Sequence, residues 1–371
     1  MSEYYVGLMS GTSMDALDAV LVDFTENPPR LAATLSRPLP PTLRARLLDL
    51  SSAADNEIER GALADQQLGR FSAETVEQLL ESAAVASQRV KAIGSHGQTI
   101  RHAPDASPPY TVQIGDGNTI AQLTGITTIA DFRRRDMVVG GQGAPLVPAF
   151  HNALYRDGRC ERVILNIGGM ANISILPADG GQPVRGFDTG PGNILLDSWC
   201  QLQQGEPFDV DGRWAASGQL NSELLQRLLN DPYFRLAPPK STGREYFNHN
   251  WLEARLHHSL PTEDIQATLV ELTVRSIAEA IHQYSPASEE VVVCGGGAYN
   301  GYLMQRLAAN LSGVRVESSA AKGIEPRWIE AMAFAWLARR TLRQLPGNLP
   351  AVTGASEAVI LGAIYPANPV S

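Results

Sequence analysis

The sequence has few cysteines. Cys160, Cys200 and Cys294 are the only three in 371 residues, and they lie far apart. They form no Cys-x-x-Cys pair and no Cys/His spacing that is typical of a zinc site. Three widely spaced cysteines also do not form the framework of a disulfide-rich secreted domain, and they fit a reducing compartment. We therefore expect no structural zinc and no disulfide.

Long apolar runs and an excess of basic residues are missing as well. No stretch approaches the ~18 consecutive apolar residues of a membrane span. The start, "MSEYYVGLM", has neither the basic segment nor the apolar core of a secretory signal. The chain has 30 Lys and Arg against 39 Asp and Glu, a net charge of −9. An acidic chain is a poor non-specific binder of nucleic acid or anionic membranes. We predict a soluble, cytoplasmic protein with neither as a partner.

Hydrophobic residues and glycine are abundant. Hydrophobic residues make up 44% of the chain, enough for buried cores, and its length favours two domains. Helical spacing of apolar residues appears at 64–84, 262–284 and 326–342. Short apolar runs, several of which end in glycine turns, alternate with these helical patterns. This alternation predicts an α/β fold.

Two segments share a layout. Residues 5–24, "YVGLMSGTSMDALDAVLVDF", and 162–176, "RVILNIGGMANISIL", both read as strand, turn of small residues, strand. This weak internal similarity indicates two similar halves. The Gly- and Pro-rich stretch at 140–148, "GGQGAPLVP", lies near the expected boundary.

The turn "MSGTSMD" at residues 9–15 supports two interpretations. In a phosphate-binding turn, Gly11 lets the ligand approach the backbone, and the hydroxyls of Thr12 and Ser13 donate to phosphate oxygens. Asp15 supplies the oxygen ligand that Mg²⁺ prefers. The same residue types also suit an ordinary hairpin turn. Because the P-loop pattern is absent, these residues alone do not decide between the two.

Two further turns are rich in glycine. Gly168 and Gly169 in "NIGGMAN" fit either a bulged hairpin or a second phosphate contact. Residues 295–297 in "CGGGAYN" follow an apolar strand and precede a helix, whose N-terminus attracts anions. A tight turn from strand to helix needs only one glycine, so three favour a ligand contact. The dinucleotide-binding fingerprint is absent.

Four motifs contain titratable side chains that are candidates for a catalytic or binding role. Asp188 in "GFDTGPGN" lies at a predicted turn, where a carboxylate serves as a general base or caps a helix. His96 in "GSHGQTIRH" is either a hydrogen-bonded loop histidine or a ligand-binding one, and its spacing does not fit metallopeptidases. The arginines at 133–135 form a surface ion-pair cluster or capture an anion. Glu330 lies in an apolar helix, although burying an unpaired charge is costly.

Taken together, the motifs resemble the anhydro-N-acetylmuramic acid kinase family. They occur in the family's order over nearly the whole chain, as "GLMSGTSMDALDAVLVDF", "GSHGQTIRH", "QIGDGN", "ADFRRRDMVVGGQGAPLVPAFH", "LNIGGMANIS", "GFDTGPGN", "STGREYFN", "CGGGAYN" and "WIEAMAFAWLA". One departure is Met14, where the family pattern has Leu, and this is a mild apolar exchange.

The resemblance implies the actin-like ATPase fold of acetate and sugar kinases, with two α/β domains around a nucleotide cleft. We expect them at 1–135, completed by about 345–371, and at 136–344. The implied reaction converts 1,6-anhydro-N-acetylmuramic acid, ATP and water into N-acetylmuramic acid 6-phosphate and ADP, in recycling of the bacterial cell wall. Mg²⁺ as cofactor and a homodimer are implied as well.

The resemblance also implies roles for residues. Asp188 matches the base that takes a proton from the attacking water, and Asp15 is the expected magnesium-side carboxylate. Glu330 matches a substrate-site carboxylate of the family. His96 and Arg134 are further expected sugar contacts, Arg134 at the lactyl carboxylate. The family's ATP-binding segment falls on Gly11, Thr12, Ser13, Met14, Asp15, Ala16, Leu17 and Asp18. The glycine turns described above add Gly168, Gly169, Gly295, Gly296, Gly297 and Asn300 as expected nucleotide contacts.

Three other functions compete with this one. Another actin-like sugar kinase would use Asp188 to deprotonate a plain hydroxyl directly. A different class is a non-catalytic nucleotide sensor or a sugar-responsive repressor. The chain is acidic and no helix-turn-helix precedes the first strand, and both features count against DNA binding. A metal-dependent peptidase of the same superfold does not fit the histidine spacing.

Overall fold

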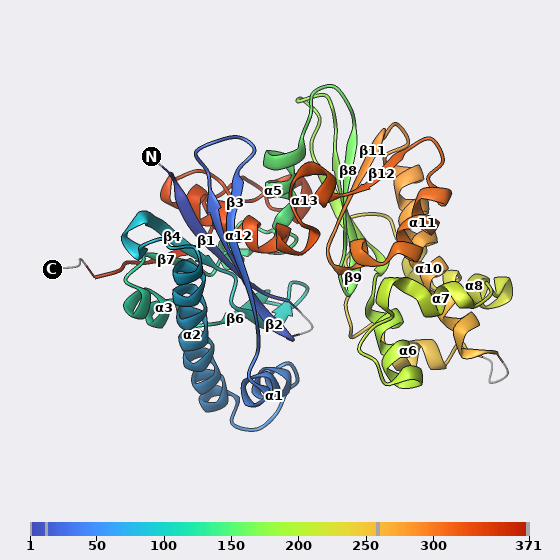
Figure 1. The fold of residues 1–371 in the computed structure, drawn as a ribbon, viewed down its shortest axis with the longest axis horizontal. Coiled ribbons are helices and arrows are strands. Elements are labelled where there is room, and N and C mark those ends of the chain that lie inside the picture. The colour runs from blue at the N-terminus through green and yellow to red at the C-terminus, as the bar shows by residue number, and fades with distance from the viewer. Residues whose placement is uncertain (1, 12–13, 257–259, 369–371) are drawn as a thin grey trace. The chain divides into compact units, whose positions relative to one another are not determined.

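The computed structural model describes residues 2–11, 14–256 and 260–368. The chain forms two compact units. Figure 1 colours the chain by residue number, from blue at the N-terminus to red at the C-terminus. Unit 1 comprises Met1–Leu154 and Trp328–Ser371, and unit 2 comprises Tyr155–Arg327. Each unit combines a β-sheet with helices, which confirms the predicted α/β class.

Unit 1 is built on a six-stranded mixed sheet with the order β13-β7-β4-β1-β2-β3. β1, β2 and β3 are antiparallel neighbours, β4 runs parallel to β1 and β7, and β13 is antiparallel to β7. A separate hairpin pairs β5 with β6. The strands are β1 Tyr4–Ser10, β2 Ala16–Asp23, β3 Arg30–Pro38, β4 Val90–Ser95, β5 Gln98–Ala103, β6 Tyr110–Ile114, β7 Thr128–Ala130 and β13 Ala363–Tyr365.

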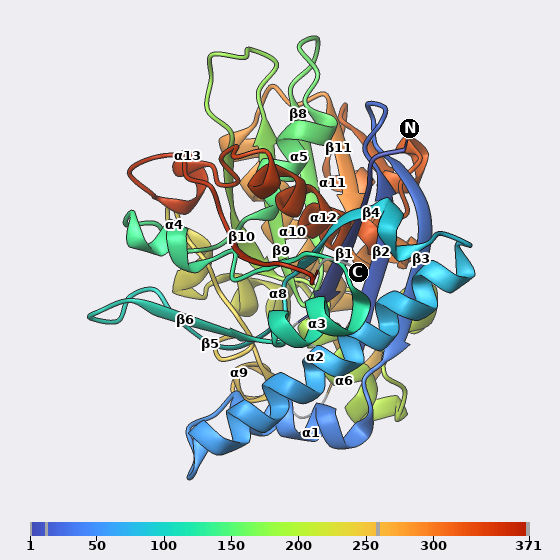
Figure 2. The same ribbon diagram turned by 90° about the vertical axis from the view of Figure 1, so that its left-hand side faces the viewer.

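Helices cover this sheet, and Figure 2 shows α2 and α3 lying close together beside it. α2 packs on β2 and β3, and α12 packs on β1 and β4. The predicted helices at 64–84 and 326–342 correspond to α2 and α12. The helices are α1 Pro41–Leu50, α2 Glu57–Ser82, η1 Ser87–Arg89, α3 Gly117–Thr124, α4 Arg134–Val138, α5 Val147–Tyr155, which ends at the boundary, η6 Pro326–Trp328, which crosses the second boundary, α12 Ile329–Leu342 and α13 Pro350–Thr353.

The alternation along β1 explains how α12 reaches the sheet. Val6 and Leu8 point into the core shared with α1 and α2, because successive side chains of a strand face opposite ways. Gly7 lies between them, and a Cβ there would overlap the carbonyl of Ala331 in α12. Gly94 in β4 has the same relation to Phe334. Two glycines therefore let the backbone of α12 approach the sheet closely.

We expect Gly94→Ala to destabilise unit 1 by about 1–3 kcal/mol, because the new methyl group pushes α12 off β4. Chemical unfolding of the full chain, followed by circular dichroism, measures the loss. Gly61→Ala in α2 is the control, since nothing lies within 4 Å of its added Cβ. That change should gain about 0.5–1 kcal/mol, because glycine is unfavourable inside a helix. Equal stability of the two variants would refute the close packing of α12.

Unit 2 is built on a five-stranded sheet with the order β10-β9-β8-β11-β12. α10 packs against β9 and β10 and against α6, α7, α8 and α11, which together enclose the core of this unit. The predicted helix at 262–284 is α10. The elements are β8 Arg162–Ile167, β9 Met170–Leu176, β10 Arg185–Pro191, α6 Ile194–Gln204, η2 Val210–Gly212, α7 Arg213–Ser217, α8 Ser222–Leu229, η3 Pro232–Arg235, α9 His249–Glu253, α10 Thr262–Tyr284, β11 Glu290–Cys294, η4 Gly296–Tyr299, α11 Gly301–Asn310, β12 Arg315–Ser318 and η5 Ser319–Lys322.

The two sheets repeat one topology. In unit 1 the order β3-β2-β1-β4-β7 has three antiparallel strands followed by two parallel additions. In unit 2 the order β10-β9-β8-β11-β12 has the same pattern. The predicted similarity between 5–24 and 162–176 is confirmed, since these segments are the first hairpins, β1–β2 and β8–β9.

The observed unit boundaries differ in position from the expected domains. The first unit extends to residue 154 instead of 135, and it resumes at residue 328 instead of about 345. The earlier resumption follows from α12, which packs on β1 and β4 through Gly7 and Gly94. β13, near the C-terminus, then pairs with β7 and adds the last strand to the first sheet.

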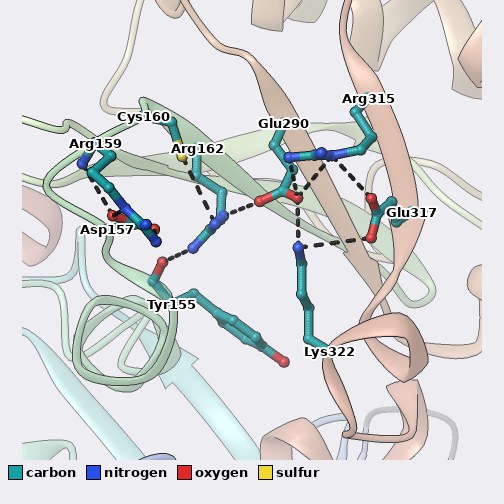
Figure 3. A network of polar contacts seen from close by, with 9 residues as sticks. All are labelled: Tyr155, Asp157, Arg159, Cys160, Arg162, Glu290, Arg315, Glu317 and Lys322. Atoms are coloured by element: carbon teal, nitrogen blue, oxygen red, sulfur yellow. Dashed lines mark hydrogen bonds and ion pairs between the residues drawn. The ribbon is translucent and has the colours of Figure 1, made fainter.

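One buried carboxylate ties the strands of unit 2 together (Figure 3). Glu290 of β11 has no solvent exposure and contacts Arg162, Arg315 and Lys322, the last at 2.6 Å. These cations come from β8, β12 and η5. Burial would raise the pKa of Glu290, but the hydrogen bonds from Lys322 and Arg162 hold it below its ordinary value. The cluster is satisfied by its own members, which indicates a structural role.

In the part of the chain that the structure describes, no helix is both long and apolar enough to cross a membrane.

Candidate active site

The first turn of the chain joins β1 to β2. Thr12 and Ser13 lie outside the described residues. Around them, the amide of Met14 donates to the Gly11 carbonyl at 3.1 Å, and Met14 has a positive φ of 54°. The hydroxyl of Ser10, the last residue of β1, donates to Gln98 Oε1 at 2.7 Å. The described residues on either side of Thr12 and Ser13 thus connect two antiparallel strands, and the end of β1 is anchored from β5.

Asp15 is paired with an arginine that the sequence analysis did not single out. Arg44 of α1 donates to Asp15 Oδ1 at 3.0 Å and to the Met14 carbonyl at 3.1 Å. The Asp15 side chain is 65% exposed, so it remains accessible to solvent beside this contact. The next residues enter β2, where Leu17 is buried in the core. Asp18 lies near Glu330 of α12 and raises the pKa of that carboxyl group.

A second group of unit 1 gathers at the ends of β4 and β7. His96 follows β4, is only 6% exposed, and packs at a tilt against the ring of Phe334 in α12, with 4.8 Å between the ring centroids. Arg133 follows β7 and donates to His96 Nε2 through Nη2 at 2.8 Å and Nε at 3.3 Å. Its Nη1 donates to the Gly143 carbonyl at 2.8 Å. The histidine is therefore held between an aromatic ring and a guanidinium.

Glu330 completes this group electrostatically. Desolvation by the surrounding protein raises the pKa of its carboxyl group. The charge of Arg133 lowers this pKa and the charge of Asp18 raises it, and the net shift is upward. Burial lowers the pKa of Arg133 to about 10, against the opposing effects of Glu330 and Asp136. The charge in the apolar helix is thus balanced by an arginine from a distant part of the sequence.

The three arginines of the cluster separate in the structure. Arg133 donates to His96 and lowers the pKa of Glu330, whereas Arg134 is 58% exposed and pairs with Asp131 at 3.4 Å. Arg135 donates to the carbonyl of Ile360 and takes no part in the group around His96.

A polar cavity of about 160 Å³ in unit 1 is lined by His96 and Arg134, together with Gln113 and Tyr365. The amide nitrogen of Gln113 donates to Thr111 and Thr99, at 2.7 and 3.1 Å. Its Oε1 is buried and accepts no hydrogen bond from the described residues. An unpaired buried acceptor beside a polar cavity suits a hydroxyl-rich ligand.

In unit 2, Asp188 lies inside β10. Its sequence context predicted a turn before a helix, and this prediction is wrong. It pairs with Asn172 of β9, and the register shifts between Asp188 and Gly190. Such a bulge redirects a side chain, and Gly190 supplies the φ of 154° that it needs. The helical turn begins only at Ile194 of α6.

The segment 240–242 surrounds Asp188. The amide of Thr242 donates to Asp188 Oδ2 at 3.0 Å, and the amide of Asp188 donates to the Lys240 carbonyl at 3.1 Å. No described residue donates to Oδ1. The hydroxyl of Tyr233 donates to the Asp188 carbonyl at 2.8 Å. Thr242 Oγ1 is buried and has no hydrogen-bond partner among the described residues.

Burial raises the pKa of Asp188 to about 6, against the lowering effects of the Thr242 amide and the Lys240 ammonium. The same burial lowers the pKa of Lys240, which lies 4.6 Å from the centre of the Tyr233 ring. A carboxylate with one oxygen held and the other uncommitted is suited to accept a proton near neutral pH.

Asp231 organises the irregular segment that carries Thr242. It is 3% exposed and accepts hydrogen bonds from the amide of Tyr233, the hydroxyl of Tyr246, Trp251 Nε1 and Arg255 Nη2, all at 2.8–2.9 Å. Burial opposes ionisation, but these donors hold the pKa of Asp231 below its ordinary value. The polar stretch 231–255 is thus folded around one buried charge.

The glycine turns of unit 2 have identifiable packing roles. Gly168 and Gly169 form the β8–β9 turn, and their carbonyls accept hydrogen bonds from the amides of residues 192–194. Gly295 has a φ of 79°, and an added Cβ at Gly297 would overlap Ile167. Gly296 is exposed, and nothing lies closer than 3.6 Å to its added Cβ. Of the three, Gly296 is therefore the one whose backbone is open to a ligand.

Asn300 caps α11, because its Oδ1 accepts a hydrogen bond from the Leu303 amide at 3.0 Å. The described residues contain no group of three or more His, Cys, Asp or Glu side chains arranged to hold a metal ion. Mg²⁺ fits a smaller donor set, since it commonly takes one or two carboxylates together with substrate phosphates and water. Asp15 and Asp18, at either side of the start of β2, are carboxylates of this kind.

Sequence reasoning missed Arg44, Gln113, Arg133, Lys240 and Thr242 as members of these groups. Thr242 and Lys240 lie in "PKSTGRE", a stretch without periodicity, and only the chain path brings them to β10. Arg133 was within the recognised cluster, but nothing in "RRRD" distinguishes its direction from that of its neighbours.

Comparison with known proteins gives a consistent result. A family model described as "Anhydro-N-acetylmuramic acid kinase" matches residues 3–367. Proteins named anhydro-N-acetylmuramic acid kinase include one from Coxiella burnetii (strain RSA 493 / Nine Mile phase I), which is 54% identical over 364 residues, 98% of this chain and 97% of the relative. One from Nitrosomonas europaea is 50% identical over 364 residues, 98% and 100% of the two chains.

Solved structures with a similar course of the chain include the activator of the 2-hydroxyisocaproyl-CoA dehydratase from Clostridium difficile with bound ADPNP. It is 14% identical, with a TM-score of 0.45, over 92% of this chain and 98% of that chain. A ROK family glucokinase from Streptomyces griseus is 12% identical, with a TM-score of 0.43, over 91% of this chain and 99% of that chain.

Proposed function

The chain belongs to the anhydro-N-acetylmuramic acid kinase family, and we propose that it converts 1,6-anhydro-N-acetylmuramic acid, ATP and water into N-acetylmuramic acid 6-phosphate and ADP. It is a kinase of amino-sugar metabolism that acts on an anhydro-sugar. The family is associated with the actin-like ATPase fold, and the repeated strand order of the two units agrees with that fold.

Asp188 is the proposed base. The observation that carries the assignment is its carboxylate, with Oδ2 held by the Thr242 amide and Oδ1 uncommitted. As water attacks the anomeric carbon, the carboxylate accepts a proton from that water, and the bond from the anomeric carbon to O6 breaks. The freed O6 then attacks the γ-phosphorus of ATP, and ADP leaves.

Unit 1 supplies the proposed sugar-binding groups and the first phosphate turn. His96, Arg134 and Glu330 remain our proposed sugar contacts, and the unpaired Oε1 of Gln113 is an added acceptor for a sugar hydroxyl. Gly11–Asp18 are the proposed ATP-binding residues, with Thr12 and Ser13 as hydroxyl donors. Asp15 is the proposed magnesium-side carboxylate, and bound Mg²⁺ would offset the negative charge that develops during phosphoryl transfer.

Unit 2 supplies the remaining proposed nucleotide contacts. These are the backbone atoms of Gly168, Gly169, Gly295, Gly296, Gly297 and Asn300, among which Gly296 is the most open. We also propose a homodimer and a cytoplasmic location, which follow from the family resemblance. The free state of Cys160, Cys200 and Cys294 agrees with the latter.

Reaction in ¹⁸O-labelled water tests the hydrolytic step. We expect one ¹⁸O at the anomeric oxygen of the product when the reaction is stopped before that oxygen exchanges with solvent. N-Acetylmuramic acid incubated under the same conditions without enzyme measures the exchange. A product without label would show that Asp188 acts on a plain hydroxyl, as in other sugar kinases.

A further inference from the structure

We infer that Arg133 is the positioning residue of His96: it fixes the imidazole as the neutral Nδ1–H tautomer, so that Nδ1 offers a donor to an acceptor oxygen of the bound sugar. The inference rests on the proposed function in one respect, because it takes unit 1 to bind the sugar. It assigns a role to an arginine that the sequence pattern did not separate from Arg134 and Arg135.

The hydrogen-bond chemistry at His96 determines the tautomer. Arg133 directs Nη2 and Nε at the same ring nitrogen, Nε2, at 2.8 and 3.3 Å. A guanidinium has only donors and no acceptor, so Nε2 must supply a lone pair and carry no proton. The proton of the neutral ring is then on Nδ1. Burial and the charge of Arg133 both lower the pKa of His96 well below its ordinary value, which disfavours a second proton.

Nδ1 lacks a partner in the part of the chain that is described. The atom is buried and makes no hydrogen bond of acceptable geometry there. The backbone of Ser10 and Gly97 favours a proton on the ring, in agreement with the Nδ1–H form, and neither carbonyl makes a hydrogen bond of acceptable geometry with Nδ1. A buried N–H without an acceptor is costly, so a ligand oxygen that pairs with it gains binding free energy.

A chain of hydrogen bonds holds Arg133 in turn. Its Nη1 donates to the Gly143 carbonyl, and the Gly143 amide donates to Asp136 Oδ2, each at 2.8 Å. Asp136 is fully buried, and its Oδ1 accepts from Asn348 and Thr353, both at 2.7 Å. The loop after α4 is thereby fastened to α13. This explains why Arg133 has one direction while its neighbours reach solvent.

Nitrogen NMR of protein labelled with ¹⁵N-histidine tests the inference without turnover. The chain has seven histidines, and His96→Gln assigns the relevant signals. We expect wild-type His96 to show a protonated Nδ1 and a bare Nε2 that does not titrate between neutral and mildly acidic pH. In Arg133→Ala, the Nε2–H form should appear, or the ring should titrate. Arg135→Ala, at the exposed neighbour, should leave the His96 signals unchanged.

Steady-state kinetics supply the second measurement. Arg133→Lys keeps the positive charge but lacks the fork of donors, and we expect kcat/KM for the anhydro-sugar to fall about ten- to hundredfold. The KM for ATP should stay near that of the wild type. A wild-type His96 with its proton on Nε2, or an Arg133→Ala variant that keeps the Nδ1–H form, would overturn the inference even if the enzyme remains an anhydro-sugar kinase. Because the wild-type spectrum is decisive alone, poor folding of a variant does not remove the test.

Discussion

Replacing Asp188 with asparagine is expected to lower kcat by about 10²- to 10⁴-fold, the usual contribution of a general base. Asparagine keeps the size of the side chain, and its carbonyl oxygen can still accept the Thr242 amide hydrogen bond. It cannot accept the proton of the attacking water. Nucleotide binding, measured by calorimetry, should remain close to that of the wild type, because no proposed nucleotide contact is changed.

The pH dependence of turnover is an independent test of the role of Asp188. Burial raises the pKa of Asp188 to about 6, so the active carboxylate form is lost as pH falls through that value. We expect an acidic limb with an apparent pKa near this value in kcat/KM of the wild type, and its absence in the residual activity of Asp188→Asn. Asp179→Asn, at an exposed loop position after β9, is the control and should retain both rate and profile.

Stability provides a further check on Asp188→Asn. The pKa of this carboxyl is higher in the folded chain than its ordinary value, so the folded state favours the protonated form. The stability that protonation contributes is present at low pH and is lost as pH rises through about 6. Asparagine resembles the protonated form, so the variant should unfold at neutral pH no more easily than the wild type. A large drop in stability, or turnover near wild type, would reject the assignment of Asp188 as a buried base.

The second large effect is expected at Asp231. Asp231→Ala should destabilise unit 2 by about 3 kcal/mol, because it removes a buried charge and leaves the partner groups of Tyr246, Trp251 and Arg255 without an acceptor. Urea unfolding of the full chain measures the loss. Hydrogen exchange should also become faster across 231–255, which includes Thr242 beside Asp188. Glu253→Ala, at an exposed position of α9, should change neither quantity by a comparable amount.

The stability that Asp231 contributes should also depend on pH. The pKa of Asp231 is lower in the folded chain than its ordinary value, so its contribution is present above that ordinary value and is lost as pH falls through the folded value. The stability difference between wild type and Asp231→Ala should therefore shrink in strong acid. A difference that does not depend on pH would mean that the charge of Asp231 contributes nothing.

Local patterns were sufficient to predict much of the fold. Apolar periodicity located α2, α10 and α12, because a helix that buries one face must repeat its apolar residues at helical spacing. The two strand–turn–strand layouts predicted the β1–β2 and β8–β9 hairpins and hence the repeated units. The placement of α12 in unit 1 was not predictable in this way, since it depends on Gly7 and Gly94 meeting a helix more than 200 residues later in the chain.

The sequence by itself determined the family, the α/β class and the names of the main candidates, including Asp188, His96 and Glu330. Each of these depends on residues that are close in the chain. Only the tertiary structure decided that Asp188 lies on a strand bulge beside Thr242, and that Arg133 is the arginine on His96. Hydrogen bonds and charge balance between distant segments are set by how sheets and loops bring them together, and no local spacing records that.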